Sequence, residues 1–169
     1  MRLLVAGRGD AGPYKTTRLR FWREDPVQFL GEVADLVPVY AAADIFILPT
    51  IYDPFSNACL EALASGLPVI TTRSNGFSEI IEDGVHGSIV DNPANLVGLR
   101  DAIRFWSDPS RRDAARSANI ERASQFDISK NVAQTLEILT RVALVRSAVL
   151  SELVRSDYPA SAASASGKI

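Results

Sequence analysis

The sequence of 169 residues has few of the side chains from which redox and metal sites are built. It contains a single cysteine, Cys59, so no disulfide can form within the chain. It also contains a single histidine, His86. One histidine and one cysteine cannot supply the ligands of a zinc site of the histidine and cysteine type. The sequence therefore offers no starting point for a structural zinc or a disulfide scaffold.

Long apolar runs and a strong net charge are missing as well. No stretch approaches the roughly 20 apolar residues that a membrane-spanning helix needs, and no signal peptide is visible. The formal net charge is −2, so nothing indicates attraction to nucleic acid. Hydrophobic residues make up 47% and charged residues 22% of the chain, which is typical of a globular protein. Together with the lone cysteine, this composition favours a cytoplasmic location.

Apolar runs and turn residues alternate along the first half of the chain. Strands are expected at Leu3–Ala6, Val27–Leu30, Ile45–Leu48, Val69–Thr72 and Ser88–Val90. Helices are expected at Tyr14–Arg23, Leu36–Ala43, Asn57–Ser65 and Phe77–Glu82. This alternation predicts a Rossmann-like α/β fold, with a parallel sheet covered by helices on both faces.

The second half of the chain is helical in pattern. Helices are expected at Ala94–Ser107, from Pro109 to about Ser124, and at Ser129–Arg155. The last helix carries an apolar stripe of Val132, Leu136, Leu139, Val142, Val149 and Leu153. The Ala- and Ser-rich residues 159–169 are expected to be a disordered tail, which leaves 1–158 as one domain.

The segment from Thr50 to Thr72 is the most informative part of the sequence. A strand leads through a loop into a short helix, which Gly66 ends and Pro68 prevents from continuing. Two carboxylates, Asp53 and Glu61, lie in this segment with seven residues between them. A loop between the carboxyl end of a parallel strand and a helix N-terminus is where open α/β sheets bind ligands.

The residue types in this loop predict the chemistry of the ligand. The backbone N–H groups of Phe55, Ser56 and Asn57 are expected to be free, because the first turn of a helix holds no acceptors for them. Such amides favour a phosphate. Asp53 and Glu61 would repel that anion, but they can accept strong hydrogen bonds from neutral hydroxyls. A nucleotide-diphosphate sugar has this layout of ribose, pyrophosphate and sugar.

At this point the sequence resembles a family, the retaining glycosyltransferases of the GT-B fold, glycosyltransferase family 4 or group 1. That family carries Glu, seven residues and Glu at this turn, followed by Glu-Ala-x-Ala-x-Gly-x-Pro-Val-Ile, and residues 61–70 match the latter at every fixed position. The resemblance covers roughly residues 3–126. Further matching segments, in chain order, are 3–9, 27–33, 40–50 and 75–81.

The resemblance implies a set of site residues. It assigns Glu61 to the ribose hydroxyls and Asp53, which replaces the family's first Glu, to the donor sugar. The residues implied at the donor sugar are Asp53, Phe55 and Ser56. The residues implied at the nucleotide are Glu61, Asn57, Ala58, Gly7, Arg8 and Gly9. No residue is assigned to a metal or as catalytic, and the absence of any Asp-x-Asp agrees with transfer without a metal or cofactor.

By the same resemblance, the chain is the C-terminal, nucleotide-sugar-binding half of a GT-B enzyme, and its own N-terminus lacks the family's basic loop. The implied reaction moves a sugar from a nucleotide diphosphate, UDP in the simplest case, to a glycan or lipid-linked acceptor, as in lipopolysaccharide core assembly. The acceptor would bind through a missing N-terminal domain, in an enzyme at the inner face of the membrane. This chain on its own is expected to be inactive and to self-associate through its last helix.

Two other functions stay open at this stage. Gly7, Gly9 and Gly12 match the dinucleotide fingerprint G-x-G-x-x-G, with Glu32 about 20 residues further on, so an NAD-binding domain is one alternative. A nucleotide-sugar-binding fragment without catalysis is the other. Cys59 is expected to be buried, His86 to lie in a surface turn, and Glu79 to complement a helix N-terminus.

Overall fold

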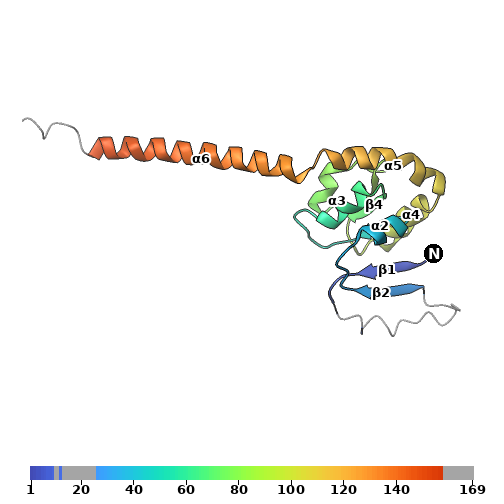
Figure 1. Ribbon diagram of the computed structural model, residues 1–169. Coiled ribbons are helices and arrows are strands. Elements are labelled where there is room, and N and C mark those ends of the chain that lie inside the picture. Colours follow the sequence, from blue (N-terminus) through green and yellow to red (C-terminus); the bar gives the residue numbers. More distant parts are fainter. Residues whose placement is uncertain (10–11, 13–25, 158–169) are drawn as a thin grey trace, which may run out of the picture. The chain divides into compact units, whose positions relative to one another are not determined.

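The computed structural model describes residues 1–9, 12 and 26–157 of the chain (Figure 1). It divides into two compact units, Met1–Arg122 and Ala123–Ile169, which are described separately. The expected domain over residues 1–158 therefore spans both units. Its boundary at 158, the expected tail and the expected helix Tyr14–Arg23 lie outside the described residues.

All five expected strands are present in the first unit, each within one residue of its predicted bounds. They are β1 (Leu3–Ala6), β2 (Val27–Gly31), β3 (Phe46–Leu48), β4 (Val69–Thr72) and β5 (Gly87–Val90). β1 pairs with β2, and β3, β4 and β5 form a second sheet in that order, with every pairing parallel. One continuous sheet was expected, whereas no hydrogen bonds join these two sheets among the described strands. Strand edges expose the same N–H and C=O groups whatever their sequence, so an apolar pattern predicts strands without predicting which edges pair.

Helices cover both faces of the three-stranded sheet, as expected. β4 lies in the middle and all four of its residues are buried. Ile70 belongs to an apolar cluster with Ala102 and Trp106 of α4 (Leu96–Trp106). On the opposite face, the hydroxyl of Thr71 accepts a hydrogen bond from Asn75, whose amide also contacts Cys59 of α3 (Asn57–Ala64). Alternation of side chains along β4 thus places α4 and α3 on opposite faces.

The remaining helices follow the predicted order. They are α2 (Val37–Ala42), the 3₁₀-helix η1 (Gly76–Ile80), α5 (Pro109–Ser124) and α6 (Ile128–Asp157). The helical segment expected at Phe77–Glu82 is thus a 3₁₀ helix. Asn75 caps it by accepting a hydrogen bond from the Phe77 amide at 3.1 Å, and extended backbone at Ile81 ends it.

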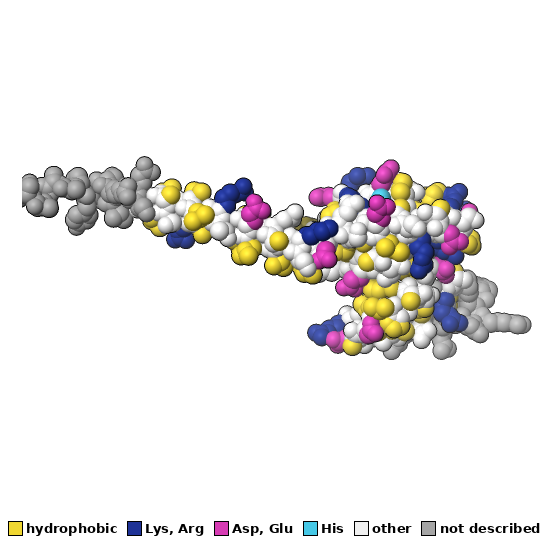
Figure 2. All heavy atoms as spheres, turned by 45° about the horizontal axis from the view of Figure 1, so that its top comes forward, with side chains coloured by type: hydrophobic (Ala, Val, Ile, Leu, Met, Phe, Trp, Pro, Cys, Tyr) yellow, Lys and Arg dark blue, Asp and Glu magenta, His cyan; other side chains and the backbone are white. Residues whose placement is uncertain are grey.

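α6 makes up most of the second unit. Its apolar side chains are exposed, with Val132, Leu136 and Leu139 each more than half accessible. Figure 2 shows hydrophobic side chains over much of this helix, with small groups of charged side chains between them. Within the part of the chain that the structure describes, no helix is both long enough and apolar enough to cross a membrane.

Candidate nucleotide-sugar site

The loop between β3 and α3 is fastened to the segment that follows β4. The Asp53 amide donates to the carbonyl of Ser74 at 3.3 Å, and the Gly76 amide donates to the carbonyl of Asp53 at 2.9 Å. A Cβ placed on Gly76 would lie 1.9 Å from the carbonyl oxygen of Pro54. Only glycine allows this approach, so Gly76 sets the path of the loop.

Threonine hydroxyls hold the start of the same loop. Thr71 donates to the carbonyl of Leu48 at 2.9 Å, and Thr72 donates to the carbonyl of Thr50 at 2.5 Å. Both threonines are fully buried. The loop is therefore tied to β4 at its beginning and to residues 74–76 in its middle, which makes it a rigid support for a ligand.

One of the three backbone amides predicted to be free at the start of α3 has an acceptor in the structure. The Phe55 amide donates to Oδ1 of Asp53 at 3.1 Å, so the expectation that it is free was wrong. An aspartate side chain often accepts a hydrogen bond from the amide two residues later. The apolar spacing that predicts a helix carries no signal for this hydrogen bond. The Cys59 amide donates to Oγ of Ser56 at 3.4 Å.

The other two predicted amides, those of Ser56 and Asn57, have no acceptor among the described residues, and the Ala58 amide joins them. Asn57 and Ala58 open α3. Their amides lie in the first turn, where the helix dipole favours negative charge. The anion-binding character expected of this turn is therefore carried by Asn57 and Ala58, next to Ser56.

Glu61 lies one turn further along α3, and its carboxylate is held by a residue that the sequence analysis missed. The Tyr40 hydroxyl donates to Oε2 of Glu61 at 3.1 Å. Burial, followed by the hydrogen bond and charge of Glu61, raises the pKa of Tyr40 from 10.0 to about 12. Tyr40 lies within the 40–50 segment that resembles the family, but nothing in its spacing pointed to Glu61.

Cys59 and Asn75 form a buried polar contact behind the loop. The Asn75 side-chain amide donates to Oγ1 of Thr71 at 3.0 Å and to Sγ of Cys59 at 3.6 Å. Burial raises the pKa of the Cys59 thiol, which keeps it protonated and unreactive. The expected structural role of Cys59 is confirmed.

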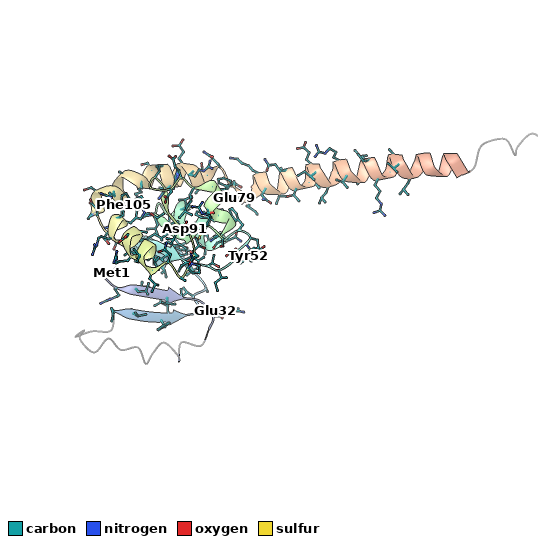
Figure 3. All side chains as sticks on the ribbon, turned by 180° about the vertical axis from the view of Figure 1, so that it is seen from behind. Met1, Glu32, Tyr52, Glu79, Asp91 and Phe105 are labelled. Atoms are coloured by element: carbon teal, nitrogen blue, oxygen red, sulfur yellow. The ribbon has the colours of Figure 1, made fainter. Side chains whose placement is uncertain are left out.

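The Gly7-Arg8-Gly9 turn follows β1, where the sequence analysis placed part of the nucleotide site. Arg8 donates to Oε1 of Glu32 at 2.5 Å, and both side chains are well exposed. In Figure 3, Glu32 and Tyr52 lie on one side of the first unit, and Met1 and Phe105 lie on the other. Among the described residues, no hydrogen bond or ion pair joins this turn to the loop before α3.

Two other polar residues singled out by the sequence, His86 and Glu79, make no hydrogen bond or ion pair with Asp53 or Glu61 in the part of the chain that the structure describes. His86 lies in the turn before β5, and its Nδ1 accepts a hydrogen bond from the Glu82 amide at 3.0 Å. Burial and the nearby Arg122 lower the pKa of His86, which favours the neutral ring. Glu79 is exposed in the first turn of η1, as expected. The described residues contain no group of three or more potential metal ligands.

A hollow elsewhere in the first unit contains none of the predicted site residues. It has a volume of about 360 Å³ and lies between β5 and α4, with Asp91 and Phe105 in its wall. In Figure 3, Phe105 lies on the opposite side of the first unit from Tyr52, with Asp91 between them.

Comparison with known proteins identifies the fold and the family. The family model described as "Glycosyl transferases group 1" matches residues 1–106. The lipopolysaccharide core biosynthesis mannosyltransferase LpsB of Rhizobium meliloti is 33% identical over 124 residues, which is 69% of this chain and 35% of that relative. An uncharacterized glycosyltransferase of Methanocaldococcus jannaschii is 36% identical over 111 residues, covering 62% of this chain and 28% of its own.

Solved structures agree with this match. Anabaena HepE, solved with UDP and with UDP-glucose, has a TM-score of 0.72 and 26% identity, covering 83% of this chain and 41% of that chain. WaaG, a glycosyltransferase involved in lipopolysaccharide biosynthesis, shares the fold with a TM-score of 0.70 and 23% identity, covering 82% and 38%. The chain spans about a third of the length of the curated relatives described here.

Proposed function

Because this chain belongs to the group 1 glycosyl transferases, we propose that it is the donor-binding half of a GT-B enzyme that uses a nucleotide-diphosphate sugar. The observation that carries this proposal is the first turn and a half of α3. Free amides at Asn57 and Ala58 suit a diphosphate, and the exposed carboxylate of Glu61 suits the ribose hydroxyls next to it. The HepE structures with UDP and UDP-glucose support UDP as the carrier.

Electrostatic stabilisation of the leaving diphosphate is the chemistry this end of α3 can supply. Backbone amides fixed by a helix need no reorganisation as negative charge develops on the departing oxygen. In this proposal no metal or cofactor takes part. The diphosphate binds the amides of Asn57 and Ala58 at the start of α3. It also binds the turn after β1, which consists of Gly7, Arg8 and Gly9. Arg8 would have to exchange its exposed partner Glu32 for the phosphate.

The donor sugar belongs beyond the diphosphate, at Asp53, Phe55 and Ser56. Asp53 uses Oδ1 to hold the Phe55 amide, which leaves Oδ2 for a sugar hydroxyl. The Phe55 ring is 38% exposed and packs edge-on against Phe77, so one face can contact the ligand. Asp53 is one methylene shorter than the glutamate of the family, and this difference affects which donor sugar the site accepts.

Retention of configuration and a glycan or lipid-linked acceptor complete the proposed reaction. The proposed acceptor is supported by relatives such as LpsB, a mannosyltransferase of lipopolysaccharide core biosynthesis, whereas retention rests on the resemblance to retaining GT-B enzymes. In such an enzyme the acceptor would bind a second domain. The whole enzyme would be cytoplasmic and would act at the inner face of the membrane. Because the chain spans about a third of its relatives, we propose that it binds the donor but transfers sugar slowly or not at all.

Self-association through α6 stays part of the proposal. Val142 and Val149 continue the exposed stripe of Val132, Leu136 and Leu139, and exposed apolar surface promotes association. Sedimentation of the chain and of a Leu136→Glu variant tests this. A variant and a parent that are both monomeric at all concentrations would contradict it.

A thermal-shift panel on the chain tests the proposed donor. UDP, UDP-glucose, GDP-mannose, ADP-glucose and NAD are compared at equal concentration, since a ligand that binds the folded chain raises its midpoint. The expected result is a shift with UDP and a UDP-sugar and none with NAD. A shift with NAD only would favour the dinucleotide-binding alternative that the Gly7–Gly9 turn raised.

A further inference from the structure

Tyr40 reaches from α2 to the predicted ribose-binding residue. Its side chain is almost completely buried, with 6% of the residue exposed. The ring packs edge-on against Phe46 of β3, with the ring centroids 5.9 Å apart. From this fixed position its hydroxyl donates to Oε2 of Glu61 at 3.1 Å, across 21 positions of sequence.

The hydroxyl proton has a clear preference between two acceptors. The carbonyl oxygen of Ala58 lies 3.4 Å from the Tyr40 oxygen, and the carboxylate of Glu61 is nearer and charged. A charged acceptor makes the stronger hydrogen bond. Burial, followed by the hydrogen bond and charge of Glu61, raises the pKa of Tyr40 to about 12, so the hydroxyl keeps its proton at neutral pH and can donate it.

This contact affects the two carboxylate oxygens of Glu61 differently. Oε2 is held by Tyr40, whereas Oε1 has no partner among the described residues. Glu61 is exposed, and an exposed glutamate without a partner would sample many rotamers. Holding one oxygen in place removes much of that freedom before a ligand arrives, which is the usual gain from preorganisation.

We propose that Tyr40 is a positioning residue for Glu61, which holds one carboxylate oxygen so that the other is presented to the ribose 2′- and 3′-hydroxyls of a nucleoside diphosphate. The inference rests on the proposed function, in which Glu61 binds ribose. It adds that selectivity for a ribose diol depends on a buried tyrosine outside α3. Tyr40 touches no ligand in this account and acts through Glu61.

Calorimetric titration of the full chain with UDP and with 2′,3′-dideoxy-UDP tests the proposal. Five proteins are compared: the parent, Tyr40→Phe, Glu61→Ala, the double variant of the last two and the control Tyr52→Phe. Tyr52→Phe is the matched control, because it removes a hydroxyl from a ring that is 75% exposed. The dideoxy nucleotide keeps the base and the diphosphate and lacks the diol, so it reports the rest of the site.

Tyr40→Phe should weaken UDP about fivefold, which corresponds to about 1 kcal/mol, and leave dideoxy-UDP unchanged. Tyr52→Phe should change neither, and Tyr40→Phe should add nothing in the Glu61→Ala background. Equal losses for the two nucleotides, an unchanged UDP affinity or a variant that fails to fold would overturn the positioning role. A parent that binds no UDP, or binds both nucleotides equally, would overturn the proposed role of Glu61 as well.

Discussion

Two turns in the first unit follow parallel strands, and each has a glutamate held by one other side chain. In the turn after β1, exposed Arg8 donates to exposed Glu32, which follows β2. After β3, Glu61 accepts from buried Tyr40, and the loop before it is fastened through Asp53 and Gly76. The first turn carries the better known sequence fingerprint, but the second has the rigid support and the free amides. A glycine pattern marks where a backbone can approach a ligand, whereas buried contacts decide whether the site is preorganised.

The largest expected difference is in stability, when one glycine at each segment is replaced by alanine. The two glycines are Gly76, which fastens the loop before α3, and Gly9, in the turn after β1. At Gly76 the new Cβ would lie 1.9 Å from the Pro54 carbonyl, whereas at Gly9 it would meet nothing within 4 Å. Gly76→Ala should therefore lower the free energy of unfolding by about 3 kcal/mol, and Gly9→Ala by less than about 0.5 kcal/mol. Urea denaturation measures both. Equal effects at the two glycines would remove the distinction between the turns.

Substitution of Asp53 separates its two hydrogen-bonding roles. Asp53→Asn keeps an oxygen for the Phe55 amide, whereas Asp53→Ala loses it. Both variants should lower affinity for a UDP-sugar, by about 1.5–3 kcal/mol if a charged hydrogen bond to the sugar is lost, and the asparagine variant should leave free UDP affinity unchanged. Calorimetry with both ligands checks this. If Asp53→Asn loses the same amount of affinity for UDP and for the UDP-sugar, the carboxylate does not bind the sugar.

Alkaline pH probes the Tyr40 contact without any ligand. The folded pKa of about 12 lies above the ordinary value of 10.0, so the unfolded chain loses this proton first as the pH rises. The stabilising effect is fully present below pH 10 and is lost between pH 10 and 12, with a slope of at most about 1.4 kcal/mol per pH unit. The parent should show this loss relative to Tyr40→Phe in denaturation curves across that range. Parallel stability curves for the two proteins would contradict the coupling.

The smallest effects are expected at the exposed turn. Arg8→Ala and Glu32→Gln should each change the free energy of unfolding by less than about 1 kcal/mol, because exposed ion pairs contribute little. Their effects on UDP binding should be opposite in sign. Losing Arg8 removes a cation from the diphosphate, whereas Glu32→Gln frees that cation. If both variants leave UDP affinity unchanged, the β1 turn takes no part in the site.

Much of this fold could be predicted from the sequence, and the reasons differ from element to element. β4 is fully buried and its bounds matched the prediction, and α3 ends just before Gly66, whose φ is +83°. The pairing of strands into two sheets could not be predicted, because it depends on contacts between segments far apart in sequence.

The site was predictable in part for similar reasons. Glu61 and the start of α3 followed from local spacing and from the resemblance to a family. The use of the Phe55 amide by Asp53 depends on a side-chain rotamer, and the contact of Tyr40 with Glu61 depends on how α2 packs against α3. Neither leaves a periodic signal in the sequence.

Calorimetric titration of UDP into the Glu61→Ala variant tests the central claim most directly. The folded variant should bind UDP about 1.5–3 kcal/mol more weakly than the parent, because a charged hydrogen bond to the ribose is lost, and Glu61→Gln should retain part of the affinity. A correctly folded Glu61→Ala chain that binds UDP as tightly as the parent would contradict it.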